Sequence, residues 1–124
     1  MAIKQTLISL DKYFESITKK EIDLGKVEKI QNIYNKVLPE EVQRIVSNAE
    51  SSIFLDDVRI LSYKEILNAE YDLHVDFKTK QMIPLADCGD NDFVVYHFDT
   101  HEWSKFNIID EVTFKKRKTL AEVL

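Results

Sequence analysis

Apolar side chains recur at steps of three and four residues through the first fifty residues, the spacing of amphipathic helices. The three stripes are Ile3, Leu7, Leu10, Phe14 and Ile17, then Val27, Ile30, Ile33, Tyr34 and Val37, then Val42, Ile45, Val46 and Ala49. Gly25 can interrupt the first pattern, and Leu38-Pro39 ends the second because proline disfavours helix at the residue before it. Pro39 also suits the first position of the next helix. The pattern therefore predicts three N-terminal helices.

After Asn48 the pattern changes to short runs of strand-forming residues between turn residues. The expected strands are residues 53–55, 58–61, 83–86, 93–98, 104–108 and 112–116. A helix is expected over residues 63–69, because Ser62 and Glu65 have the S-x-x-E spacing of a capping box. Thr119 can cap a terminal helix that reaches Leu124. The alternation over residues 71–77 fits either an edge strand or an ordered loop, and both alternatives stay open.

Residues 82–106 hold the longest run in which strand formers alternate with turn residues. Side chains of a strand alternate between its two faces, and both faces of the expected strand 93–98 carry apolar residues. We expect this sheet to pack against the helix that carries Ile30, Ile33 and Val37. The fold class predicted is α+β, a small, mainly antiparallel or mixed sheet packed by N-terminal helices, in a single domain spanning residues 1–124.

Composition and charge narrow the function classes. The 124 residues are 44% hydrophobic and 31% charged, and the formal net charge is −5. A negative chain argues against a general binder of nucleic acid, which usually needs a basic face, and suits basic partners. The single cysteine, Cys88, excludes an internal disulfide and is compatible with a reducing cytosol. No run approaches the roughly 20 apolar residues of a membrane span, so we expect a cytoplasmic protein without a membrane partner.

Five segments follow one another in an informative order. They are EKIQNIY, LPEEVQRIV, VRILSYKEIL, IPLADCGDNDFVVYHFD and VTFKKRKTLAEVL. This order resembles the SUKH superfamily, also called Smi/Knr-like after fungal cell-wall-synthesis regulators, and the resemblance covers residues 27–124. The family usually has an Asn-Gly-rich loop after the helix that follows Leu-Pro, whereas residues 47–52 of this chain contain no glycine.

The resemblance implies an α+β fold without catalysis or cofactor. For most bacterial members it further implies an immunity protein that binds and neutralises a cognate polymorphic toxin domain, often a nuclease. The alternative is an intracellular regulatory protein–protein interaction module like the fungal members. We expect a protein partner, most simply a basic toxin domain, and a chain that is a monomer or a weak dimer.

Aspartates in predicted turns offer a surface for such a partner. The candidate toxin-binding residues are Asp56, Asp57, Asp90, Asp92 and Trp103. Aspartate is also common in turns because it hydrogen-bonds its own backbone, so each has a structural explanation as well. A collective acidic rim would speed association with a basic domain. Tyr71, Phe77, Tyr96 and Trp103 are candidate aromatic anchors, and Trp103 is preferred because it follows a turn.

One cysteine and two histidines are the candidates for catalysis. Cys88 with His97 or His101 has the residue types of a nucleophile and a base, but neighbouring aspartates such as Asp87 oppose formation of a thiolate. We therefore expect no enzyme.

Two further patterns concern the binding of a metal ion and of phosphate. His97, Asp99 and His101 alternate at the end of an expected strand, as metal ligands can. We favour a turn that contains Asp99 and His101, with the His97 ring hydrogen-bonded in the sheet. Residues 115–118, Lys-Lys-Arg-Lys, are better explained as a solvated strand edge than as a phosphate contact, because edge lysines deter edge-to-edge pairing. We expect no metal.

Overall fold

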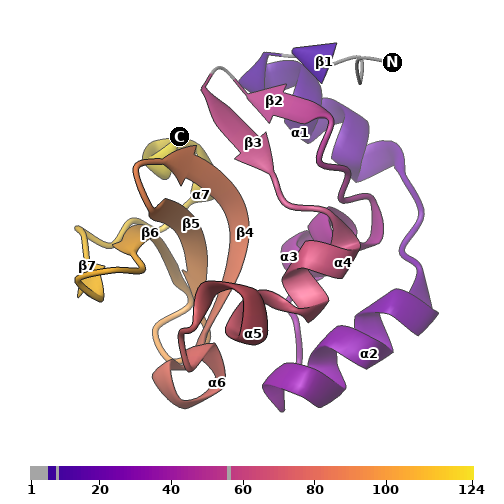
Figure 1. The fold of residues 1–124 in the computed structure, drawn as a ribbon. Helices are drawn as coiled ribbons and strands as arrows, with labels where there is room; N and C mark the ends of the chain where they lie inside the picture. The colour runs from indigo at the N-terminus through magenta and orange to yellow at the C-terminus, as the bar shows by residue number, and fades with distance from the viewer. Residues whose placement is uncertain (1–5, 8, 56) are drawn as a thin grey trace, which may run out of the picture.

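The structure, a computed structural model, describes residues 6, 7, 9–55 and 57–124, and in them an α+β fold (Figure 1). The strands are β1 (Thr6–Leu7), β2 (Ile53–Leu55), β3 (Val58–Ile60), β4 (Met82–Gly89), β5 (Asp92–His97), β6 (Glu102–Asn107) and β7 (Val112–Thr113). The helices are α1 (Leu10–Lys19), α2 (Leu24–Tyr34), α3 (Glu40–Ser47), α4 (Tyr63–Leu67), α5 (Ala69–Leu73), α6 (Phe77–Lys80) and α7 (Leu120–Val123). The predicted fold class is confirmed.

The described strands form one sheet in chain order, from β1 to β7. The β1 strand runs parallel to β2, and every later neighbour is antiparallel, so β2 to β7 form a continuous meander. Figure 1 shows α1, α2, α3 and α4 gathered on one side of the molecule and β7 at the far end of the sheet. Successive turns of a meander alternate between the two ends of the sheet, which decides where turn residues meet.

The N-terminal helices begin and end at local signals. Ser9 accepts from the Lys12 N–H and starts α1, and Asp23 accepts from the Lys26 N–H and starts α2. The prediction that a helix runs through Leu7 was wrong, because residues 6 and 7 pair with β2 instead. Ile3, in the same predicted stripe, lies outside the described residues.

Gly25 and Val37 show two further differences from the sequence prediction. The break between the first two helices falls before Gly25, which lies in the first turn of α2. Val27, Ile30 and Tyr34 form the buried stripe of α2, whereas Ile33 and Val37 are exposed. Val37 is exposed because Asn35, in the left-handed conformation with φ of 54°, ends the helix, so Val37 no longer follows the helical spacing of the buried residues.

Residues 71–77 are mostly helical, so neither alternative left open by the sequence was correct. They contain the end of α5, left-handed His74 with φ of 56°, and the start of α6. Asp76 caps α6 by accepting from the Thr79 N–H at 3.1 Å. The apparent alternation arises because Val75 and Phe77 are buried as the chain passes from one short helix to the next.

Several local predictions are confirmed. The Ser62 hydroxyl accepts from the Glu65 N–H at 3.1 Å, and the Glu65 carboxylate accepts from the Ser62 N–H at 3.0 Å, which completes the capping box of α4. Thr119 caps α7, because its hydroxyl accepts from the Glu122 N–H at 3.4 Å. The last strand is shorter than predicted, since β7 covers two residues and only Arg117 forms an isolated bridge beyond it.

Both faces of the central strands are covered, as predicted. On one face, Phe77 of α6 packs edgewise on Phe106 of β6, with ring centroids 6.2 Å apart. On the other, Tyr34 of α2 lies 6.5 Å from Phe98, which packs on Tyr96 of β5 at 5.5 Å. The buried rings hold β4, β5 and β6 between the helices, and their turns are left at the surface.

Candidate partner-binding surface

Two hairpin turns place aspartates at the same end of the sheet. The β2–β3 turn holds Asp57 and the β4–β5 turn holds Asp90, and both residues are exposed. Arg59 on β3, just after the first turn, pairs with Asp87 on β4, just before the second. Neighbouring hairpins therefore carry both carboxylates at one edge of the molecule. Asp56, also expected on this rim, lies outside the described residues.

Left-handed backbone shapes the β4–β5 turn. Asp90 and Asn91 have φ of 52° and 65°, and Gly89 pairs with Asp92 across them. Positive φ at both central residues is the pattern of a type I′ hairpin turn, which Asp and Asn tolerate better than most residues. Asp92 is half-buried, and its Oδ1 accepts from Asn107 Nδ2 of β6 at 2.9 Å. The side chain of Asp90 is thus exposed on a well-defined turn, while Asp92 stabilises that turn through its hydrogen bond to Asn107.

The guanidinium beside these turns is already neutralised. Arg59 donates to both oxygens of Glu65, at 2.8 and 3.0 Å, and its Nη2 lies 3.5 Å from Asp87 Oδ2. The Arg59 hydrogen bond, with help from the Ser62 N–H, holds the pKa of Glu65 below its usual value although burial opposes this. One cation faces two carboxylates, so the cluster keeps an excess of negative charge. This network ties β3, β4 and α4 together beside the turns.

Tyr71 is the exposed member of the set of aromatics considered from the sequence. Its side chain is 83% exposed on α5. Its neighbour Asp72 lines a hollow of about 110 Å³ together with Arg59 and Asp87. The α5 helix therefore borders the cluster of Arg59, Glu65 and Asp87 through Asp72, and Tyr71 is the exposed aromatic side chain of that helix.

Trp103 is buried, which contradicts the expectation of an exposed anchor. Its side chain is 2% exposed and packs on Tyr96 with ring centroids 5.0 Å apart. Its backbone exchanges hydrogen bonds of 2.7 and 2.6 Å with Arg117. Trp103 follows a turn but is buried, because it is the second residue of β6 and faces Tyr96 across the strands. Trp103 therefore belongs to the core and not to a partner surface.

Cys88 has the properties of a packed thiol. Its pKa is raised to about 11, mainly by burial and to a smaller extent by Asp87 and Asp92, while Lys105 acts to lower it. The thiolate is the nucleophilic form of cysteine, so a thiol with this pKa is a poor nucleophile at neutral pH. The aspartates named from the sequence act in the direction expected, although burial is the larger cause.

The two histidines of the metal hypothesis bond to different partners. His97 Nε2 lies 2.7 Å from Ser104 Oγ in the core, which confirms the expected hydrogen-bonded sheet histidine. His101 Nδ1 lies 2.9 Å from the Tyr96 hydroxyl. Burial, then Lys116, lowers the pKa of His97. Among the residues that the structure describes, no group of three or more His, Cys, Asp or Glu side chains is placed to hold a metal ion.

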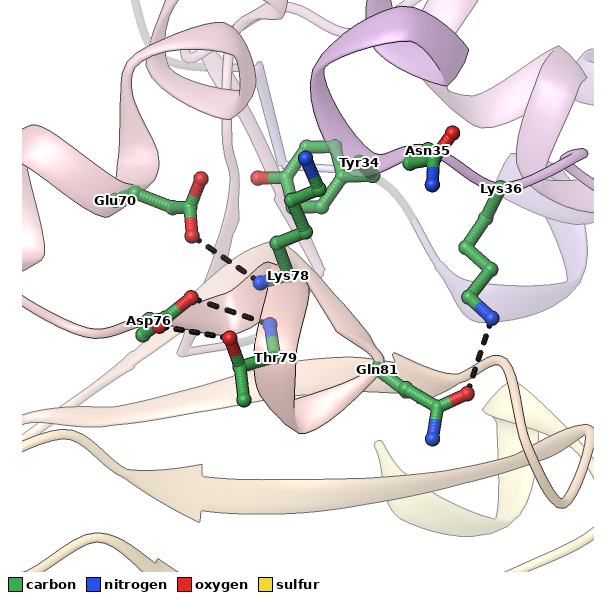
Figure 2. Close-up of a pocket in the computed structure, with 8 residues that line it drawn as sticks. All are labelled: Tyr34, Asn35, Lys36, Glu70, Asp76, Lys78, Thr79 and Gln81. Carbon is green, nitrogen blue, oxygen red and sulfur yellow. Dashed lines mark hydrogen bonds between the residues drawn. The ribbon is translucent and has the colours of Figure 1, made fainter.

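A second hollow, of about 590 Å³, lies between the end of α2 and α6 (Figure 2). Its lining consists of Tyr34, Asn35, Lys36, Glu70, Asp76, Lys78, Thr79 and Gln81. Glu70 accepts from the Lys78 N–H at 3.1 Å, and Lys36 Nζ donates to Gln81 at 3.0 Å. Two lysines and two carboxylates give no net charge, and most of these polar groups bond one another. The sequence did not predict this hollow, whose lining comes from segments far apart in the chain.

Comparison with protein-family models, with curated proteins and with solved structures finds no match to this chain. Among the described residues, no helix has the length and apolar character needed to cross a membrane.

Proposed function

We propose that this protein is a non-enzymatic binding protein that neutralises a basic partner domain, as an immunity protein neutralises its cognate toxin domain. The observation that supports this proposal most directly is the pair of exposed turn carboxylates, Asp57 and Asp90, at one end of the sheet. The nearby Arg59 does not cancel them, because Glu65 and Asp87 already surround its guanidinium. The order of motifs that resembles the SUKH superfamily supports the immunity role in particular.

The chemistry of the surface indicates how it would act. Exposed carboxylates attract a basic domain over a distance and raise the association rate. An exposed aromatic, Tyr71 of the α5 helix, would contact the partner after docking and slow its dissociation, because Tyr is enriched among residues that dominate binding energy. A basic nuclease is the partner class that suits this surface best, since its substrate-binding face must itself attract phosphate.

Growth rescue tests the function directly. A candidate toxin domain, taken from the genes that neighbour this one, is expressed in bacteria with and without this protein, and the wild-type chain is expected to restore growth. The double variant Asp57→Lys/Asp90→Lys, which reverses charge at the proposed surface, should lose most of the protection. The matched control Asp11→Lys/Glu28→Lys makes the same charge change on α1 and α2, where both residues are exposed, and should protect like the wild type.

Further outcomes separate the alternatives. Cys88→Ala should protect fully, because no nucleophile is required. Failure of the wild-type chain to rescue growth would contradict the immunity role and favour a regulatory interaction module. Equal loss in the control and in the Asp57/Asp90 variant would place the toxin-binding surface elsewhere.

A further inference from the structure

The smaller hollow, of about 110 Å³, lies where one face of the sheet meets α4 and α5. Arg59 pairs with Asp87, and Asp87 with Phe93, across β3, β4 and β5, so these three side chains point to the same face. Glu65 of α4 and Asp72 of α5 line the hollow from the helical side. The hollow is therefore built mainly on strands and helices, which hold its lining in place.

The charges around the hollow favour a cation. Glu65, Asp72 and Asp87 are carboxylates and Arg59 is a guanidinium, so three negative charges and one positive leave a net charge of −2. Arg59 is already engaged, since it donates to both oxygens of Glu65, at 2.8 and 3.0 Å, and its Nη2 lies 3.5 Å from Asp87 Oδ2. The exposed carboxylate of Asp72 forms no hydrogen bond or ion pair with the other residues that the structure describes. An incoming cation can therefore bind Asp72 without breaking a contact of Arg59.

Apolar side chains form the rest of the lining. Leu61 and Phe93 are 3% and 6% exposed, and Leu73 of α5 is half-buried. Sites for small molecules and cofactors usually measure roughly 300–1,000 Å³, so this hollow is too small for one. It has room for the end of one long side chain, because a single water takes only about 30 Å³. The lining thus suits a side chain with an apolar stem and a positive end.

We propose that the hollow receives a lysine side chain of the basic partner domain, an inference that rests on the function proposed above. A lysine combines an apolar, flexible stem with a compact ammonium that carries three donors. The stem packs on Leu73 and Phe93, and the ammonium donates to Asp72 and Asp87. The lysine thereby offsets part of the negative charge that the hollow carries when the partner is absent.

Two other side chains fit the hollow less well. A partner carboxylate would add a fourth negative charge to a site that already has an excess of them, and like charges in an interface oppose binding. A partner arginine binds best to a carboxylate that offers both oxygens to its planar guanidinium. Glu65 already gives both of its oxygens to Arg59. The ammonium of lysine needs no such planar acceptor.

The hollow and the turn carboxylates have different roles in binding. Arg59 follows the turn that holds Asp57, and Asp87 precedes the turn that holds Asp90, so the hollow adjoins both turns. The exposed turn charges act before contact and raise the association rate. A lysine enclosed in the hollow acts only in the docked complex and slows dissociation. The two sets of residues are therefore separable by kinetics.

Titration with a lysine analogue tests the hollow by itself. In NMR spectra of the whole chain at constant ionic strength, N-acetyl-lysine-methylamide should shift the amide signals of Leu73, Asp87 and Phe93. Binding should saturate in the millimolar range, since one side chain makes few contacts. The norleucine analogue, which has the stem without the ammonium, should shift these signals little, and the arginine analogue should bind more weakly.

Three results of this titration would overturn the proposal. The first is the absence of a saturable shift at the hollow up to about 100 mM lysine analogue. The second is an equal shift with the norleucine analogue, which would show that the carboxylates contribute nothing. The third is equal or tighter binding of the arginine analogue, which would overturn the choice of lysine.

Variants of Asp72 test which carboxylate holds the ammonium. Asp72→Asn changes an exposed side chain, so the thermal melt should be retained, and should weaken binding of the lysine analogue about threefold or more. Asp72→Lys places an ammonium of the chain itself at the hollow and should abolish saturable binding. The control Glu28→Gln removes a carboxylate from an exposed position on α2 and should bind like the wild type. Equal affinity of Asp72→Asn and the wild type would overturn the role of Asp72.

Binding to a candidate toxin domain separates this inference from the proposed function. In surface plasmon resonance, Asp72→Asn should dissociate about threefold faster or more with little change in association, while Glu28→Gln should match the wild type. If the toxin domain binds the wild type and Asp72→Asn dissociates at the same rate, the proposed function stands and the lysine in the hollow is overturned. If the lysine analogue titrates the hollow but the wild type binds no candidate toxin domain, the hollow stands and the immunity role fails.

Discussion

The middle of β5 and the turn before it are a few residues apart and have opposite roles. Val94 and Val95 have no exposed surface, whereas Asp90 projects into solvent with left-handed backbone. The strand contributes apolar area to the core, and the turn contributes charge to the surface. One hairpin thus carries both stability and the proposed binding chemistry, and substitutions should separate the two.

The largest effect is expected for Val95→Asp. An unpaired carboxylate in a fully buried site should destabilise the domain by about 4 kcal/mol or more, a large share of the roughly 5–15 kcal/mol of a typical domain. Thermal and urea denaturation measure the change. Val37→Asp places the same group at a position that is 81% exposed and should melt like the wild type. An unchanged melt of Val95→Asp would contradict the assignment of β5 to the core.

A pH effect is expected from His97, the last residue of β5, at the end of the strand away from the Asp90 turn. Burial, then Lys116, lowers its pKa from the ordinary 6.5, so the unfolded chain takes up a proton below pH 6.5 that the folded chain does not. Stability is therefore full above pH 6.5 and falls as the pH drops, with a slope of up to about 1.4 kcal/mol per pH unit. In His97→Gln, the free energy of unfolding, measured by urea denaturation, should depend less on pH between pH 6.5 and 5. An unchanged slope in that variant would assign the dependence to other groups.

A smaller effect is expected for Tyr34→Phe. The Tyr34 hydroxyl donates to the Ile66 carbonyl at 3.0 Å in the buried contact between α2 and α4. Its loss should cost about 1 kcal/mol, while the ring contact with Phe98 remains. Tyr71→Phe removes the same hydroxyl from a side chain that is 83% exposed and should stay within about 0.5 kcal/mol of the wild type. Equal urea midpoints for the two variants would show that the buried hydroxyl bond contributes nothing.

The sequence predicted the elements whose signals are local. The alternating runs of β2 to β6 and the capping box of Ser62 and Glu65 lie within a few residues of one another, so pattern and chemistry agree. Residues 71–77 were not predicted, because their burial depends on which surface each short helix meets. Trp103 was misplaced for the same reason, since its burial comes from pairing with Tyr96 and Arg117.

The candidate surface was predicted in part. Asp57 and Asp90 are visible as turn residues, but their presence at one end of the sheet follows from the pairing of Arg59 with Asp87. That pairing joins positions far apart in the chain, so it cannot be predicted from the pattern of neighbouring residues. The neutralisation of Arg59 was likewise missed, because Glu65 comes from a helix and Asp87 from another hairpin.

The central claim is that the turn carboxylates steer a basic partner. Surface plasmon resonance with the cognate toxin domain should compare Asp57→Asn/Asp90→Asn with the control Asp11→Asn/Glu28→Gln at low and moderate salt. Charges act over about 30 Å at 0.01 M salt and about 10 Å at 0.1 M. The account predicts that the turn variant associates several-fold more slowly and with a flatter salt dependence, while its dissociation changes little and the control matches the wild type. An association rate and salt dependence equal to those of the wild type would contradict it.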